Sequence, residues 1–370
     1  MKAFANIKSR YAEYKALDSA DKAKAWKEGL INNAIYLLII IAVIYTYTQN
    51  SRFLSVASVV NIISLSAANI PIACGIAGTI VLTGTDLSAG RVVGLTACIS
   101  ASLLQSVTYA TKIFPDLPVL PIPLVILIVI VVGGIVGWVN GFFVAKFHLH
   151  PFIVTLAGMF FGRGMTAIIS TDMISIKNEL FLKWANYRFY MPFGSTNKKG
   201  KFIPAYIPPT VVIALIVVII IAVLLKYRKF GRKLYAIGGN RQSALMMGLN
   251  VKKTIFNAYV LDGFLAGLGG FLFCLNSCAG FVEQAKGFEM DAIAAAVIGG
   301  TLLTGGVGTV VGSLFGSLIK GIIETIITFQ GTLSSWWTRI VIALLLCFFV
   351  ILQSVFKSIR EKRLAQGNEK

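Results

Sequence analysis

Long apolar runs dominate this chain, and each is close to the roughly 20 residues that a helix needs to cross a lipid bilayer. Only 13% of the residues are charged, whereas soluble domains average about 25%. No alternation of the kind found in barrel strands is visible. We therefore expect an all-α, polytopic integral membrane protein of about ten transmembrane helices. The expected spans are residues 31–49, 59–83, 88–108, 119–144, 151–170, 207–225, 255–277, 290–304, 307–328 and 334–353.

Positive charge is concentrated in three stretches of the chain. Of the 34 Lys and Arg residues, seven lie in 1–30, eight in 226–253 and five in 357–370. These stretches flank apolar runs, and Lys and Arg beside membrane spans mark the cytoplasmic side. We therefore attribute the net charge of +19 to membrane orientation and not to a nucleic-acid partner. Ten crossings leave both termini in the cytoplasm, as these clusters require.

The sequence predicts three regions. Residues 1–30 form a cytoplasmic amphipathic segment that can lie on the membrane surface, residues 31–355 the transmembrane domain, and residues 356–370 a basic cytoplasmic tail. Two long connections interrupt the transmembrane domain. By the span count, residues 171–206 are extracytoplasmic, although they carry six Lys and Arg residues, and residues 226–254 are cytoplasmic.

A short helix is predicted within the cytoplasmic connection. Asn240 is a good N-cap and Gly248 a good residue to follow a helix, so they bracket about two turns at 241–247. So short a helix is unstable alone, and its apolar residues need a surface, either on the protein itself or on a separate cytoplasmic protein. The residues expected at a partner contact are Asn240, Arg241, Gln242, Ala244, Leu245, Met246, Met247 and Gly248.

One apolar stretch is broken at residues 84–91 (GTDLSAGR). The preceding sequence GTIVLTG at 78–84 returns in weaker form as GTLLTG at 300–305. Such breaks are costly in a bilayer unless protein covers them or they line a wet cavity. Paired breaks in two halves of a membrane protein point to a translocation path. We therefore predict a weak internal repeat, in which each of the two breaks forms half of the barrier that closes this path.

The polar residues near the breaks suit an uncharged, polyhydroxylated solute, which exchanges its hydration for hydrogen bonds. Asp86 either contacts this solute or holds Arg91 and the following half-helix in place, and the second role is favoured. The candidate path residues are Asn69, Thr83, Thr85, Asp86, Ser88, Arg91, Thr304 and Thr309.

No catalytic pattern is present in the sequence. It has no P-loop and no paired carboxylates or metal ligands at a useful spacing. The glycine-rich segments at 133–137 and 267–270 are interpreted as surfaces for close helix packing. We expect a protein that is not an enzyme and that binds no cofactor or metal itself.

Residues 83–91 resemble the Gly-x-Asp-Leu-Ser-x-Gly signature of bacterial sugar ABC-importer permeases, whose members carry ribose, xylose, arabinose and galactosides. The similarity runs from about residue 31 to 355. Residues 103–105 and 151–153 are most similar to the galactose/methyl-galactoside branch. Other segments that resemble the family, in the same order along the chain, are 230–232, 236–240, 248–251, 291–300 and 305–309.

The resemblance implies a permease subunit in the bacterial plasma (inner) membrane that moves a monosaccharide inward by alternating access: galactose, glucose or a methyl galactoside. It also implies two cytoplasmic ATPases that bind ATP and Mg, an extracytoplasmic sugar-binding protein and a second permease copy that forms a homodimer. Membrane lipid would surround this chain. The helix at 241–247 would be the coupling helix, seated in a groove of the ATPase. The family commonly has Pro-Glu-Ala-Ala where this chain has RQSA at 241–244, so apolar contacts would carry more of the docking.

Two other functions stay open from the residues alone. A branched-chain amino-acid or nucleoside permease would share much of this architecture. A proton- or sodium-driven carrier would use Asp86, Asp262 or Glu324 as a relay and would need no partner subunit.

Overall fold

The computed structural model describes residues 34–49, 53–106, 112–196, 202–283, 285–330, 336–348 and 350–351. The predicted amphipathic segment 1–30 and basic tail 356–370 lie outside the described residues. Residues up to Ser51 and residues from Arg52 onward form two separate units. In the first unit, α3 (Ala34–Gln49) occupies the apolar run expected at 31–49.

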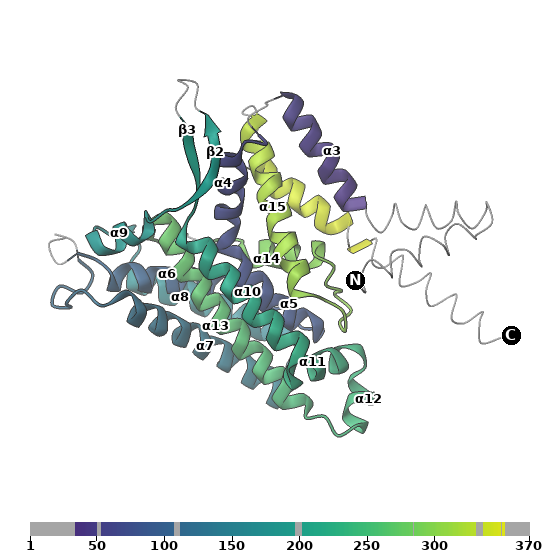
Figure 1. The fold of residues 1–370 in the computed structure, drawn as a ribbon. Coiled ribbons are helices and arrows are strands. Elements are labelled where there is room, and N and C mark those ends of the chain that lie inside the picture. Colours follow the sequence, from purple (N-terminus) through teal and green to yellow (C-terminus); the bar gives the residue numbers. More distant parts are fainter. Residues whose placement is uncertain are drawn as a thin grey trace, which may run out of the picture. The chain divides into compact units, whose positions relative to one another are not determined.

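The other apolar runs form the helices of the second unit (Figure 1). Five of the described helices are long and apolar enough to cross a membrane. They are α7 (Ile122–Lys146), α8 (Pro151–Ile169), α10 (Pro209–Tyr227), α13 (Val251–Ser277) and α15 (Val310–Gln330). A sixth span results if α4 (Val56–Ala67) and α5 (Asn69–Val81), which meet at an angle of 49°, are taken together.

The bend between α4 and α5 coincides with a proline. Pro71 has no N–H to donate to the carbonyl of Ala67, the last residue of α4, and its ring crowds that carbonyl. Asn69 lies at the bend, where it is buried and neither polar atom of its side chain has a hydrogen-bond partner.

Three further helices are shorter: α6 (Ala89–Leu103), α14 (Phe288–Ile298) and a helix at Trp336–Phe348. With 11 residues, α14 is about 16 Å long and reaches roughly half-way across a bilayer. Ten full-length spans are therefore not present among the described residues, which contain five or six. The two breaks account for part of this difference, because the first lies between α5 and α6 and the second ends α14.

Two small antiparallel sheets depart from the all-α expectation. One pairs β1 (Ile174–Ser175) with β4 (Ala279–Gly280), and the other is a hairpin of β2 (Phe189–Thr196) and β3 (Phe202–Ile207). The hairpin belongs to the 171–206 connection, which also holds α9 (Glu179–Ala185). Its register shifts between Tyr190 and Gly194, around Pro192, which has no N–H to donate to a strand ladder.

The 226–254 connection lies at the opposite end of the helices from the hairpin (Figure 1). It forms α11 (Lys229–Gly239) and α12 (Arg241–Met246). The helix α12 was predicted, and α11 was not. Within α11, Gly231, Leu234 and Ile237 are buried. Their spacing of three places them on one face, which packs onto the transmembrane helices.

The helix α13 is the centre of the unit and packs against α5, α6 and α7. Glycines let α7 and α13 approach closely: a Cβ added at Gly133 would lie 2.3 Å from the carbonyl oxygen of Gly263, and one at Gly137 would lie 2.3 Å from that of Tyr259. The interpretation of 133–137 and 267–270 as packing surfaces is confirmed. This rigid pair forms the wall against which the first break lies.

Candidate functional site at the two helix breaks

The first break separates α5 from α6 by a non-helical turn at residues 82–88. Thr83 has a positive φ of 62°, so the chain turns away from the axis of α5. The Oδ1 atom of Asp86 accepts hydrogen bonds from the backbone N–H of Ser88 at 2.7 Å and from its hydroxyl at 2.6 Å. The carboxyl group therefore holds the turn that leads into α6.

Neighbouring helices fix this turn with two hydrogen bonds. The side-chain amide of Asn140 on α7 donates to the Ser88 hydroxyl at 2.8 Å. The hydroxyl of Thr155 on α8 donates to the backbone carbonyl of Thr85 at 3.2 Å. The polar residues of α7 and α8 thus satisfy groups that a helix break exposes, as the low-dielectric surroundings require.

The helix α13 adds an acid and a phenol to the turn. Asp262 is fully buried, and apart from the neighbouring Asp86 carboxyl its two oxygens have no hydrogen-bond partner among the described residues. It lies close enough to Asp86 for the two carboxyl groups to interact electrostatically. The buried hydroxyl of Tyr259 also has no partner, and a Cβ added at Gly84 would lie 2.5 Å from it. Buried polar groups without partners are costly, and within this cluster the Tyr259 hydroxyl keeps its hydrogen-bonding capacity free in this conformation.

The cluster is closed in this conformation. Asp86 is 2% exposed, and Ser88 is 1% exposed. Of the predicted path residues in the turn, only Thr83 is exposed. A solute can therefore contact Asp86 only after the surrounding helices have moved apart. Sequence reasoning proposed Asp262 only as a relay and missed Tyr259, although their spacing of three places both on one face of α13.

Arg91 does not form the expected contact with Asp86. No ion pair joins these two residues among the described part of the chain. Arg91 is buried in α6, and its Nη1 atom has no hydrogen-bond partner in the part of the chain that the structure describes. A Cβ added at Gly90 would lie only 1.9 Å from Oε2 of Glu289. Gly90, next to Arg91, thus belongs to the contact between α6 and α14.

The second break separates α14 from α15 at residues 299–309. Three of its glycines have positive φ: 92° at Gly300, 85° at Gly305 and 76° at Gly306. Thr309 begins α15, because its hydroxyl accepts from the N–H of Gly312 at 2.9 Å. Thr304 is exposed in this segment.

The two breaks contact each other directly, although more than 200 residues separate them in the chain. The N–H of Gly306 donates to the carbonyl of Val81, the last residue of α5, at 2.9 Å. The bond satisfies a carbonyl that the end of α5 leaves without a helical partner. The structure thus brings Thr83 and Gly305 together: a Cβ at Gly305 would lie 2.5 Å from the Thr83 methyl carbon.

The helix α11 closes over this junction. A Cβ added at Gly238 would lie 1.9 Å from the carbonyl oxygen of Val81 and 2.8 Å from the nitrogen of Gly306. We call the meeting point of Val81, Gly238 and Gly306 the three-way contact. The hydroxyl of Tyr235, one turn earlier on α11, donates to the carbonyl of Gly308 at 2.9 Å. Burial raises the pKa of Tyr235, which keeps this donor protonated.

A cavity of about 300 Å³ opens beside the first break at the α12 end of the helices. Thr83, Gly84 and Tyr259 line it from the break, His148 from the α7–α8 connection, and Arg241 from α12. Arg241 Nη2 and His148 Nδ1 are 3.5 Å apart. The first residue of α12 and the first break thus share one cavity.

The helix α12 has the predicted caps. The Asn240 side chain accepts from the N–H of Ser243 at 2.9 Å, and Gly248 has a positive φ of 74°. Ala244 is buried, whereas Leu245, Met246 and Met247 are 53%, 82% and 66% exposed. The helix therefore anchors one side to the protein and presents apolar side chains outward. Arg241 and Gln242 are also exposed.

Residues 51–350 match the family described as "Branched-chain amino acid transport system / permease component". The chain belongs to this family. The matched range of this transport-permease family includes both breaks, the three-way contact and α12. No solved structure matches the chain.

Several curated relatives of this transport permease are similar over most of both chains. An inner membrane ABC transporter permease protein of Escherichia coli (strain K12), YjfF, is 36% identical over 88% of this chain and 92% of its own. The galactose/methyl galactoside import permease protein MglC of the same strain is 36% identical over 91% and 98%. Its ribose import permease protein RbsC is 31% identical over 90% and 95%.

Proposed function

We propose that the chain is the membrane-embedded permease subunit of an ATP-binding-cassette importer that moves a monosaccharide into the cell. The relatives named for a substrate are permeases for galactose and methyl galactoside, fructose or ribose. The structural observation that carries the proposal is the continuous path of contacts from the exposed helix α12, through α11, to both helix breaks. Such a path can transmit a movement at α12 to the segments that close the membrane barrier.

Galactose, glucose or a methyl galactoside is the proposed substrate group. The buried cluster at the first break supplies hydroxyl, amide and carboxyl groups from Asp86, Ser88, Asn140 and Tyr259. These groups can exchange hydrogen bonds with sugar hydroxyls. In this proposal Thr83, Thr85, Thr304 and Thr309 line the path as the breaks separate, and Asn69 and Arg91 hold the helices beside it.

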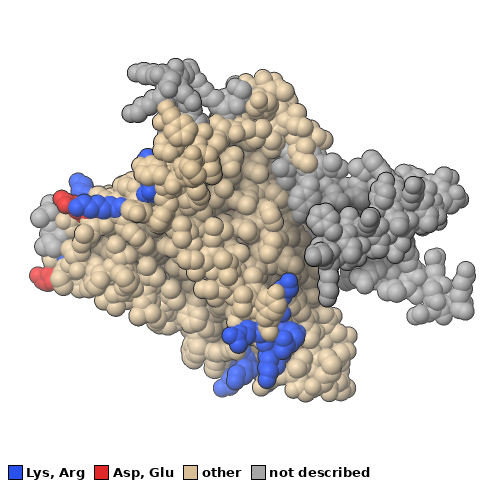
Figure 2. Space-filling view, viewed as in Figure 1, with Lys and Arg blue, Asp and Glu red and all other residues tan. Residues whose placement is uncertain are grey.

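The proposed orientation places α11 and α12 in the cytoplasm of a bacterial cell. On the face shown in Figure 2, Lys and Arg atoms gather over α11 and the adjoining helix ends. The exposed residues of this patch include Arg228, Lys229, Arg232 and Lys233, and Lys and Arg beside spans mark the cytoplasmic side. Ten passes, two of them containing the short helices α6 and α14, would return both termini to this side of the inner membrane.

A cytoplasmic ATPase is the proposed partner of α12. Leu245, Met246 and Met247 form an exposed apolar knob next to the basic patch, which fits an apolar groove with an acidic rim. ATP and Mg would bind to that ATPase and not to this chain. When the ATPases close, α12 would move with them, and Gly238 would carry the movement to Val81 and Gly306.

A second permease copy is proposed to cover charged residues on α14 and α15. Lys320 is near the middle of the 21-residue helix α15, about 15 Å from either end. It pairs with Asp291 at 2.7 Å and, with Glu324 and Arg339, lines a cavity of about 280 Å³. Charges at this depth do not face lipid, so a second copy or the aqueous path between two copies is expected there.

The test is uptake by proteoliposomes that contain the permease and its ATPase, with the sugar-binding protein outside and ATP inside. Labelled galactose, glucose, ribose, leucine and adenosine are compared. ATP-dependent uptake of a hexose that resists an uncoupler supports the proposal. The family description names branched-chain amino acids, so leucine uptake without sugar uptake would establish that second candidate instead. Uptake by the permease alone that an uncoupler abolishes would identify an ion-coupled carrier.

A further inference from the structure

A third cavity lies beneath the β2–β3 hairpin, at the opposite end of the helices from α12 (Figure 1). Its volume is about 230 Å³. The walls come from α4, from the last residue of α9 and residues 186–188 that follow it, from β3 and from the last turn of α13. It is separate from both helix breaks, and in the proposed orientation it opens on the extracytoplasmic side, where an incoming solute arrives.

The polar wall of this cavity is built from neutral groups. Asn61 and Ser64 come from α4, Asn186 from the segment after α9, and Asn276 from α13. Asn186 donates to the Leu182 carbonyl at 2.9 Å, which leaves its amide oxygen available, and the side chain of Asn61 has no partner among the described residues. Amides both donate and accept, which matches the hydroxyl groups of a sugar.

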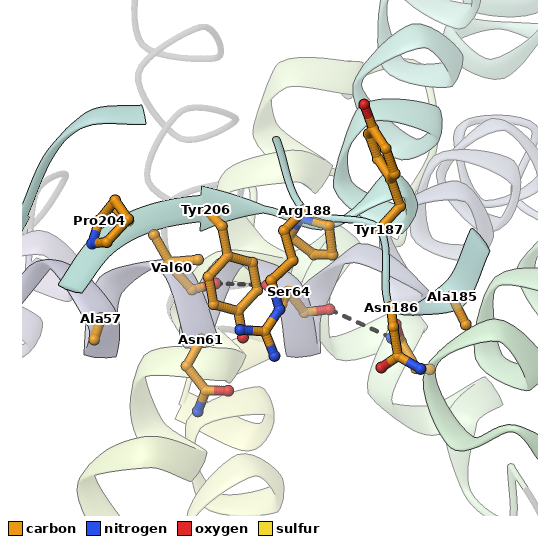
Figure 3. A pocket seen from close by; sticks show the side chains of 13 residues that line it. Ala57, Val60, Asn61, Ser64, Ala185, Asn186, Tyr187, Arg188, Pro204 and Tyr206 are labelled. Carbon is orange, nitrogen blue, oxygen red and sulfur yellow. Dashed lines mark hydrogen bonds between the residues drawn. The ribbon is translucent and has the colours of Figure 1, made fainter. Parts of the chain in front are cut away.

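One wall of the cavity is aromatic. The guanidinium of Arg188 lies 4.3 Å from the ring centre of Tyr206, and this cation–π contact fixes both side chains. Figure 3 shows the stacked pair with Asn61 below it and Asn186 to one side. An aromatic surface next to amide groups can receive a pyranose, whose C–H face is apolar and whose edge carries hydroxyls.

The size and charge of the cavity limit the ligand. At about 230 Å³ it is smaller than the roughly 300–1,000 Å³ of sites for drug-sized ligands, so a single sugar ring fits and an oligosaccharide does not. Among the described residues that line it there is no Asp, Glu or Lys, and Arg188 is the one that is charged. Since that charge is already engaged with Tyr206, the lining favours a neutral polyol over an anionic lipid headgroup.

We propose that this cavity is an external sugar-docking site of the permease, which receives a monosaccharide before it reaches the breaks. The proposal rests on the proposed sugar import and adds a site to it. Asn61 and Asn276 hydrogen-bond the sugar hydroxyls, and the Tyr206 ring supports the sugar face.

Binding is tested on the purified permease–ATPase complex in lipid nanodiscs without the sugar-binding protein. Saturation-transfer NMR is recorded with galactose, glucose, maltose and glycerol phosphate. The variants are Asn61→Leu and Tyr206→Ala, and the control is Val59→Ala, which is exposed on the same helix and does not line the cavity. We expect monosaccharide signals in the wild type and the control, with binding about five-fold weaker for each hydrogen bond lost in Asn61→Leu.

The outcomes separate the two proposals. If the complete importer carries a hexose but the complex alone gives no sugar signal, or one that Asn61→Leu and Tyr206→Ala leave unchanged, the docking site is wrong and the importer function stands. A signal from glycerol phosphate but from no sugar would also overturn the docking site, in favour of a lipid headgroup. If the complete importer carries no sugar at all, the proposed function itself fails.

Discussion

The three-way contact predicts that Gly238→Ala uncouples this permease from its ATPase. The new Cβ would lie 1.9 Å from the Val81 oxygen and 2.8 Å from the Gly306 nitrogen. Real Cβ contacts essentially never fall below 3.0 Å, and both neighbours are backbone atoms that cannot rotate away. Relief therefore requires α11 to retreat by about 1 Å.

The size of the effect follows from two contributions. Overpacking of a fitted site costs about 1–3 kcal/mol, and weakening the hydrogen bond from Gly306 to Val81 costs about 1 kcal/mol. The total of about 2–4 kcal/mol corresponds to a 30- to 900-fold loss if all of it falls on the transport step. Because α11 can relax in part, we expect uptake to fall at least about ten-fold.

The assay compares Gly238→Ala with Gly239→Ala in the proteoliposome system. The neighbouring position is a matched control, since a Cβ added at Gly239 meets nothing within 4 Å. Both variants should retain the ATPase on purification, because neither alters the exposed knob of α12. In Gly238→Ala, ATP hydrolysis should continue without a corresponding uptake of sugar, whereas Gly239→Ala should transport like the wild type. Equal uptake by the two variants would refute the role of the three-way contact.

Four further predictions follow from the same site. Tyr235→Phe removes the hydrogen bond to Gly308 and should lower the free energy of unfolding by about 1 kcal/mol. Because the pKa of Tyr235 is raised in the folded protein, this stability difference between wild type and variant should be constant around neutral pH. It should shrink only above about pH 10, as thermal unfolding at a series of pH values would show. Met246→Glu combined with Met247→Glu should abolish co-purification of the ATPase, and unchanged association and uptake would refute the docking assignment. Asn140→Leu leaves the Ser88 hydroxyl without its donor and should cost about 1–3 kcal/mol, measured as a lower Tm. Asp262→Asn keeps the shape of the buried cluster, so ATP-driven uptake should persist, and its loss would favour proton coupling.

Much of the fold could be predicted from local patterns. The apolar runs located the helices, because a lipid environment requires each span to satisfy its own backbone. Asn240 and Gly248 located the ends of α12, because caps act over three or four residues. The predicted role of Asp86 in holding the half-helix agrees with its bonds to Ser88, whereas its predicted pairing with Arg91 is not formed.

Other features could not be predicted from local sequence patterns. The helix α11 is rich in Lys and Arg and was interpreted only as a charged loop, because its buried face consists of one glycine and two aliphatic residues. Each strand of the β2–β3 hairpin contains a proline, Pro192 in β2 and Pro204 in β3, and prolines conceal the alternation of a strand. The contact between Gly90 on α6 and Glu289 on α14 joins residues almost 200 positions apart, and no local pattern links the two.

The sequence by itself determined that this chain is a helical membrane protein with two breaks in its apolar runs and a capped helix between its halves, since length, polarity and capping are local properties. Only the tertiary structure decided that the breaks touch, that α11 lies against both, and that Asp86 is closed off beside Asp262. These contacts depend on glycines that allow backbones to meet at hydrogen-bond distance. A glycine in the sequence shows that close approach is permitted, but which backbone approaches it is settled by the packing of the whole chain.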